Sequence, residues 1–204
     1  MIRVPLRDLR VAFSDPSRYV GTFRPGKRGG GPSKYNMLLF AVGEFHHTNN
    51  LKQAQDYLEK KIVANFPNAA DLPQYVQQLQ SYTREFAKLG NAFVRVKDNI
   101  SIPIPKAFEG IAVSGQAARI DLVASGGYAV WIFGRGIVDW ELDPRLPLIQ
   151  LAYSQRLGVN LNEVSAGVYD FKTSNHSSKS FTQSQVDQVN KSLRKLLTLI
   201  QQKF

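Results

Sequence analysis

Residues 118–133 read ARIDLVASGGYAVWIF, two short apolar segments on either side of the pair Gly126-Gly127. The glycine pair predicts a two-residue hairpin turn, because glycine adopts the positive φ that such turns require. Arg119–Ala124 and Tyr128–Phe133 are therefore expected to form neighbouring strands. Asp121 stands out in the first of them, since a carboxylate among apolar residues costs free energy unless something pairs with it. It is either a functional residue or an aspartate on the solvent face of a half-exposed strand.

The segments around this hairpin predict a mixed α/β domain. Apolar residues recur at helical spacing between Lys34 and about Ala64, with an interruption near His46–Asn50, and again from Leu72 to Leu89. After Gly90 the pattern favours strands. The remaining expected elements, in chain order, are strands at 93–96, 100–104 and 111–113, a helix from Asp143-Pro144 to Gly158, strands at Val164–Phe171 and Ser180-Phe181, and a helix over Thr182–Gln202.

Composition limits the possible classes. The chain has 204 residues, 43% of them hydrophobic, which suits one domain with a genuine core. It contains no cysteine, so disulfides and thiolate metal sites are excluded. Its formal net charge of +10 suits a polyanionic partner, since Lys and Arg that neutralise phosphates release counterions. A basic surface that binds nothing is the alternative.

Neither a membrane span nor a signal peptide is expected. The longest apolar runs, such as Met37–Val42, are far shorter than the roughly 20 residues of a spanning helix. The first ten residues carry three arginines and an aspartate, so they lack the apolar core of a signal peptide. The sequence therefore predicts a cytoplasmic protein without a membrane partner.

A basic, glycine-rich segment runs from Arg18 to Lys34 without an acidic residue. It is not a P-loop, because no Gly-Lys-Ser/Thr ending follows a strand. It is either a clamp on a nucleic-acid backbone or a solvated loop. As a clamp it would bind through its five cationic residues, Arg18, Arg24, Lys27, Arg28 and Lys34.

The order of several short motifs resembles the RecB-like branch of the PD-(D/E)XK, or restriction-endonuclease-like, nuclease superfamily. Gly43-Glu44-Phe45-His46-His47 is similar to the family's Gly-x-x-x-His element, and Ala118-Arg119-Ile120-Asp121 to its Gly-x-Ile-Asp element, with alanine in place of glycine. Gln150-Leu151-Ala152-Tyr153 resembles the Gln-x-x-x-Tyr helix, with the tyrosine one residue early. The likeness spans roughly His47 to Phe204.

The resemblance implies a single restriction-endonuclease-like domain, with a central mixed sheet flanked by helices. Residues 1–90 would form the basic loop and a helical N-terminal part, and residues 91–204 the nuclease-like core. It also implies Mg²⁺ or Mn²⁺ as cofactor, with His47 and Asp121 as ligands and Gln150 and Tyr153 supporting the site. The implied activity is hydrolysis of DNA phosphodiesters.

The chain departs from the family at the acidic-x-Lys motif. By hairpin length this motif belongs at the end of Tyr128–Phe133, where the sequence reads Phe133-Gly134-Arg135. Asp139 would be the displaced second carboxylate if residues 134–136 bulge, with Glu141 where lysine belongs. Arg135 would then supply the positive charge, although arginine places it differently from lysine.

Asp170-Phe171-Lys172 matches the acidic-x-Lys text more literally than any other segment. It follows the Gln/Tyr helix, however, whereas the family order places the motif before that helix. We therefore interpret it as part of a later structural strand, with a rearranged site as the alternative.

Three functions remain open from the sequence. The first is a metal-dependent DNA nuclease with His47, Asp121 and Asp139 or Glu141 around Mg²⁺. The second is a catalytically inactive nuclease-like domain that binds DNA or serves as a scaffold for a protein partner in a DNA-processing complex. The third is an RNA-binding accessory factor that acts through charge alone.

Overall fold

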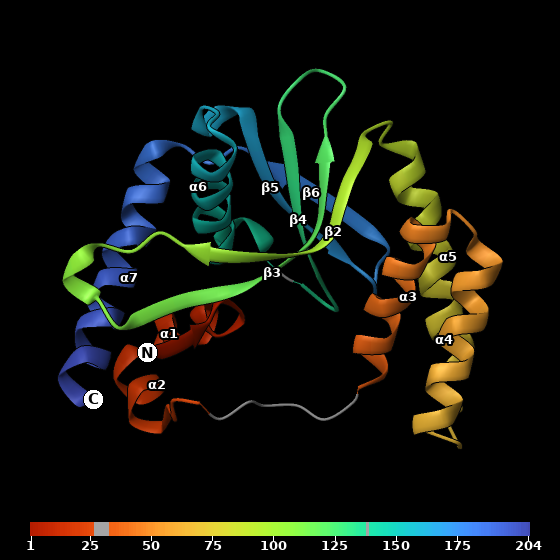
Figure 1. The fold of residues 1–204 in the computed structure, drawn as a ribbon, viewed down its shortest axis with the longest axis horizontal. Coiled ribbons are helices and arrows are strands. Elements are labelled where there is room, and N and C mark those ends of the chain that lie inside the picture. Colours follow the sequence, from red (N-terminus) through yellow and green to blue (C-terminus); the bar gives the residue numbers. More distant parts are fainter. Residues whose placement is uncertain (27–32, 138) are drawn as a thin grey trace.

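A mixed six-stranded sheet forms the centre of the computed structural model, which describes residues 1–26, 33–137 and 139–204 (Figure 1). The strands run in the order β1-β3-β4-β5-β6, and β2 pairs with β3 outside this path. They are β1 (Ile2–Pro5), β2 (Ala92–Ile102), β3 (Ile111–Leu122), β4 (Tyr128–Gly134), β5 (Val164–Asp170) and β6 (Asn175–Lys179).

Strand β3 organises the sheet because it pairs with three others. Its first residues lie parallel to β1, with Ile2 opposite Ile111, while β2 runs antiparallel along almost its whole length. Its last residues pair with β4, so that Asp121 lies opposite Ala129. Strand β5 continues parallel to β4, with Gly134 opposite Asp170, and β6 forms an antiparallel edge.

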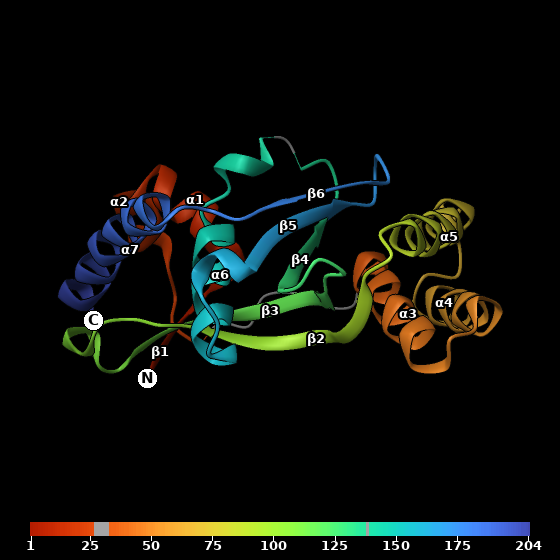
Figure 2. The same ribbon diagram turned by 90° about the horizontal axis from the view of Figure 1, so that it is seen from above.

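The helices form two groups on opposite sides of the sheet (Figure 2). One group contains α3 (Lys34–Thr48), α4 (Leu51–Asn65) and α5 (Leu72–Lys88). The other contains α1 (Leu9–Ser14), α2 (Pro16–Thr22), α6 (Arg145–Leu157) and α7 (Gln183–Lys203). Alternation along the strands divides the apolar residues between two cores, so Val130 and Ile132 face the α6–α7 side while Ala129 and Trp131 face the α3–α5 side.

Local signals in the sequence account for most helix ends. The Ser33 hydroxyl caps α3, Asn49 ends it in the left-handed conformation, and the Asn50 side chain caps α4. Gly158 ends α6 with a φ of 67°. Thr182 and Gln185 form a reciprocal capping box at the start of α7.

The expected mixed α/β fold is confirmed, and four local expectations are wrong. The segments predicted as separate strands belong to the continuous strands β2 and β3. The hairpin is wider than a two-residue turn, because the amide of Val123 donates to Gly127 and the last ladder pair is Leu122 with Tyr128. Ser180-Phe181 is not a strand, whereas the polar segment Asn175–Lys179 is one, since an edge strand needs no apolar pattern.

The N-terminal part also contributes β1 to the sheet, a strand that the helical pattern of this part did not indicate. Within the described ranges, none of the helices combines the length and the apolar character needed to span a bilayer.

Candidate functional site

Asp121 is a fully buried carboxylate with both oxygens engaged. It lies near the end of β3, with 0% of its surface exposed. The Arg119 Nε donates to its Oδ1 at 2.6 Å, and the Trp131 indole Nε1 donates to its Oδ2 at 2.9 Å. Arg119 and Asp121 are two residues apart on one strand, so their side chains share a face. Asp121 is therefore half of a buried ion pair.

Arg119 connects this ion pair to the helices α3 and α5. Its Nη1 donates to the Tyr82 hydroxyl at 3.1 Å and to His46 Nε2 at 3.3 Å. The same His46 nitrogen lies 2.7 Å from the Tyr82 hydroxyl. The guanidinium also lies over the Phe86 ring, 4.1 Å from its centroid. Three elements are thus held together by one network of buried polar groups.

Burial sets the protonation states in this network. It lowers the pKa of His46 to about 3, and the Arg119 charge acts in the same direction. The imidazole is therefore neutral near pH 7, and Nε2 accepts from its neighbours. Burial also raises the pKa of the Asp121 carboxyl, against the opposing effects of Arg119, Trp131 and the Asn91 side chain. Burial likewise raises the pKa of the Tyr82 hydroxyl.

Aromatic rings fill the space around the ion pair. Phe86 and Trp131 meet edge to face, with ring centroids 5.4 Å apart, and Tyr82 lies 5.4 Å from both Phe133 and Tyr169. His46 stacks on Phe93 at 4.2 Å. We call this set the aromatic cluster; its members are His46, Tyr82, Phe86, Phe93, Trp131, Phe133, Tyr169, Phe171 and His176.

The residues around Asp121 do not fit a magnesium ion. Mg²⁺ takes an octahedron of oxygen ligands, whereas the Asp121 oxygens face an arginine and an indole N–H. No group of three or more His, Asp or Glu residues able to hold a metal occurs in the part of the chain that the structure describes. The expected Mg²⁺ or Mn²⁺ site is therefore not assembled around Asp121.

Strand β4 offers Asp121 no second carboxylate. Trp131 is the β4 residue whose side chain contacts Asp121, and Phe133 follows two residues later on the same face. An acidic-x-Lys motif sharing a metal with Asp121 would need its carboxylate on this face of β4, at 129 or 131, where the chain has alanine and tryptophan. The prediction from hairpin length had this motif at 133–135, because the sequence does not show where the last ladder pair lies.

The structure does not bring Asp139 or Glu141 to Asp121. Both follow the end of β4 at Gly134, which is about 17 Å along the strand from the partner of Asp121. Asp139 is exposed, and Glu141 pairs with Lys179 at 2.7 Å. Arg135 donates to the Tyr75 hydroxyl at 3.0 Å. None of the three residues 135, 139 and 141 therefore adds a ligand or a charge to the ion pair.

His46, and not His47, faces the sheet. His47 was expected as a metal ligand from the family resemblance, but its side chain is exposed on α3, one residue away from the face that packs on Arg119. On a helix, successive side chains point about 100° apart, so a one-residue shift changes the face. His46 contributes a neutral acceptor instead.

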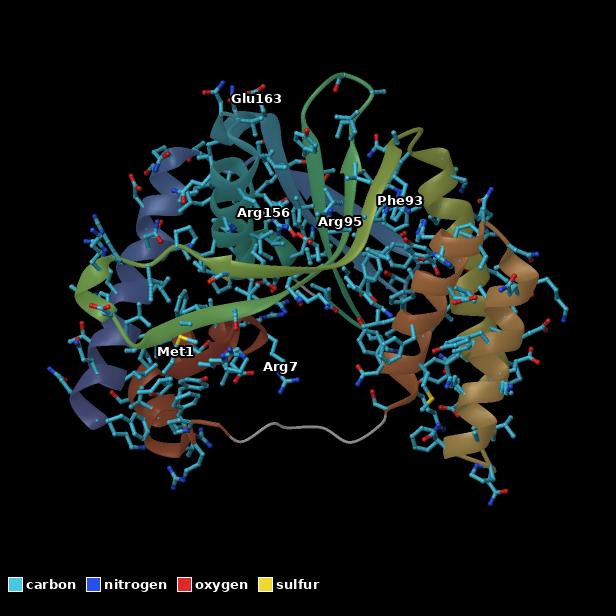
Figure 3. All side chains as sticks on the ribbon, viewed as in Figure 1. Met1, Arg7, Phe93, Arg95, Arg156 and Glu163 are labelled. Atoms are coloured by element: carbon cyan, nitrogen blue, oxygen red, sulfur yellow. The ribbon has the colours of Figure 1, made fainter. Side chains whose placement is uncertain are left out.

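Gln150 and Tyr153 hold the fold together at a distance from Asp121. The Gln150 amide bridges Leu161 and Phe181, accepting from the Phe181 amide at 2.7 Å. The Tyr153 hydroxyl donates to Asp98 at 2.5 Å. Arg156 and Arg95, both labelled in Figure 3, also donate to Asp98. This second polar cluster joins β2 to α6.

Asp170 holds the loop that follows β4. Its oxygens accept from the amides of Gly136, Ile137 and Lys172 at 2.7–2.9 Å. The parallel pairing with β4 brings it beside Gly134 rather than beside Asp121. This geometry agrees with the interpretation of Asp170-Phe171-Lys172 as part of a structural strand end.

The predicted nucleic-acid-binding residues are only partly described. Lys27 and Arg28 lie outside the described residues. Arg18 and Arg24 are exposed on and after α2, and Arg24 donates to the Gly21 and Phe23 carbonyls. Lys34 pairs with Asp71 at 2.5 Å. Of these three, Arg18 and Arg24 present the more exposed charge.

Three members of the site were not predicted from the sequence: Tyr82, Trp131 and Arg119. Arg119 carried a signal, since a cation two residues from a buried aspartate shares its strand face. Nothing in the sequence marked Tyr82 or Trp131 as part of the site, because an aromatic residue in an apolar pattern is typical of a hydrophobic core.

Comparison with known proteins supports the fold alone. A scan against protein-family models finds no match, and neither does a search of curated proteins. Among solved structures, the chain is similar to a protein from Eubacterium rectale that bears the provisional name of exonuclease, with a TM-score of 0.52 and 11% identity over 98% of this chain and 82% of that one. The chain has a nuclease-like fold. A second structure, that of SSO0001, reaches a TM-score of only 0.37 at 7% identity, over 94% of this chain and 86% of that one.

Proposed function

We propose that this chain is a catalytically inactive nuclease-like domain that binds DNA. The observation that carries the proposal is that Arg119 and Trp131 together engage both oxygens of the Asp121 carboxylate, which a RecB-like enzyme would offer to a metal. The nuclease-like fold and the net charge of +10 support a nucleic-acid partner. In this proposal, the packed side chains of the aromatic cluster lie where an active enzyme would have its catalytic centre.

Wild-type protein is expected to show no metal-dependent cleavage. With Mg²⁺ or Mn²⁺, degradation of single- and double-stranded DNA should equal that of the protein in EDTA, because the Asp121 oxygens are not available to a metal. The assay is a time course with end-labelled DNA of both kinds. Cleavage that requires the metal and disappears in Asp121→Asn, in a variant shown to be folded by circular dichroism, would contradict the proposal.

DNA binding is expected without metal and with strong salt dependence. In EDTA, the logarithm of the association constant should fall linearly with the logarithm of salt concentration, with a slope of about −0.9 for each phosphate neutralised on duplex DNA. Fluorescence anisotropy of labelled DNA between 50 and 300 mM salt, roughly the range over which such contacts weaken most, measures it. Absence of binding at the lowest salt would overturn the DNA-binding part of the proposal.

A further inference from the structure

A cavity of about 390 Å³ lies between the N-terminal 3₁₀ helix at Leu6–Asp8, helix α3 and strands β2 to β4. It is separate from Asp121, since its β3 residues precede the ion pair. Figure 3 labels Arg7, which projects into the region between the N-terminal helices and α3. The residues used below line it: Arg7, Tyr35, Val96, Lys97, Ala118 and Phe133.

Lys97 lines this cavity and has an unusual backbone conformation. Its φ is 52°, in the left-handed region, although it lies inside strand β2. Residues other than glycine rarely adopt this conformation, and they do so mostly where the surrounding structure imposes it, often at functional sites. In a regular strand the successive side chains of Val96 and Lys97 would point to opposite faces of the sheet, yet both residues line the cavity. The strained residue therefore adds a cation to a wall that a regular strand would leave apolar.

Gly43 makes room for the lysine side chain. It lies inside α3, where glycine is less stable than alanine. A Cβ at this position would come within 3.2 Å of Lys97 Nζ. A glycine within a helix and a lysine in the left-handed region are both locally unfavourable. Together they fix the position of the Lys97 ammonium group.

The Lys97 ammonium has no carboxylate partner within the described ranges. Its contact is with the Phe40 ring, whose centroid lies 3.8 Å from Nζ. The side chain is half-buried, and burial lowers the pKa of its ammonium. Arg7 adds a second cation at the rim, with Asp8 at 3.5 Å. A half-buried cation without a counterion is suited to an anionic ligand.

We propose that this cavity, the Lys97 cavity, binds one nucleotide of a single-stranded nucleic acid, with the phosphate on Lys97 and the base among the apolar walls. The proposal rests on the nucleic-acid binding proposed above and gives it a site. Tyr35 and Phe133 contribute rings to the walls, and aromatic side chains stack on bases without regard to sequence. The volume lies at the lower end of ligand pockets, which suits one base rather than a larger group.

The first test removes the charge without adding strain. Asparagine tolerates the left-handed region, so Lys97→Asn should fold normally. The control is Lys60→Gln, which removes the same charge from an exposed position on the outer helix α4. Affinity for a labelled oligo-dT should fall in Lys97→Asn, and its salt slope should decrease in magnitude by about 0.7, the value for one phosphate on a single strand.

The second test displaces the lysine and fills the cavity. Gly43→Ala should raise thermal stability, because alanine favours the helix, and yet weaken oligo-dT binding by moving the ammonium. Ala118→Leu keeps every charge but occupies the space of the base. Wild-type protein should prefer oligo-dT to a base-free strand of equal length, and Ala118→Leu should lose this preference.

The outcomes separate the two proposals. If wild-type protein binds no DNA, the proposed function fails and the Lys97 cavity with it. If wild-type protein binds but Lys97→Asn behaves like Lys60→Gln, only the Lys97 cavity is overturned. If Lys97→Asn weakens binding while oligo-dT and the base-free strand bind equally well, the base does not enter, and the nucleotide assignment is overturned.

Discussion

Replacing Arg119 by methionine is expected to lower the free energy of unfolding by about 3–5 kcal/mol at pH 7. Methionine retains most of the volume but leaves the Asp121 carboxylate buried without its cation. Arg119 is also what holds the pKa of Asp121 down against burial, so the pKa should rise further in the variant. Urea denaturation followed by far-UV circular dichroism measures the loss.

The pH dependence of this variant has a definite sign. A carboxyl whose pKa is higher in the folded state than in the unfolded state binds more protons when folded, so it favours folding more as the pH falls. Arg119→Met should therefore lose less stability relative to wild type near pH 5 than at pH 7. A second substitution, Asp121→Leu, should restore much of the stability, because it removes the unpaired charge. Equal stability of wild type and Arg119→Met would show that the ion pair does not support the fold.

Asp98→Asn is expected to destabilise the protein by about 1.5–3 kcal/mol, the value for hydrogen bonds to a charged group. The Asp98 carboxylate accepts from Tyr153 and Arg156 at 2.5 Å each and thereby ties β2 to α6. Burial acts to raise its pKa, but the hydrogen bonds from Tyr153 and Arg95 and the contacts with Arg156 outweigh burial, so the pKa of Asp98 is lowered. Chemical denaturation at pH 7 measures the effect.

The lowered pKa also predicts acid sensitivity. A carboxyl with a lower pKa in the folded state stabilises the protein above its unfolded pKa of about 3.9, and the contribution is lost as the pH falls through the folded value. Asp98→Asn should remove this part of the acid destabilisation. Asp56→Asn, which breaks an exposed pair with Lys52, is the matched control and should change stability by less than about 0.5 kcal/mol. Equal effects of the two substitutions would contradict a structural role for Asp98.

The fold was predictable where periodicity and turn residues act locally. The break between α3 and α4 follows from Asn49 and Asn50, and the end of α6 from Gly158, because these residues suit the conformations that end and begin helices. Strand β6 was not predictable, since a polar edge strand is stabilised by its partner and not by its own pattern.

The role of Asp121 was not predictable from its neighbours in sequence. A buried aspartate in a hairpin strand suits a metal ligand and an ion pair equally well, and the decision depends on which side chains arrive from α3, α5 and β4. His46 and His47 differ only by which face of α3 packs on the sheet, and a helical pattern in which both flank apolar residues does not fix that rotation to one residue. The Lys97 cavity was hidden for a similar reason, because a strand pattern does not reveal a single left-handed residue.

The most direct test of the central claim uses the indole proton of Trp131. The chain has two tryptophans, and the Trp131 N–H donates to Asp121 while Trp140 lies outside this contact. A paramagnetic Mn²⁺ ion bound at Asp121 would broaden the Trp131 indole resonance much more strongly than that of Trp140, because the broadening falls steeply with distance. In a ¹H–¹⁵N titration with Mn²⁺, we expect both indole resonances to broaden only to the same slight extent. Selective loss of the Trp131 resonance at stoichiometric Mn²⁺, abolished by Asp121→Asn, would contradict the account.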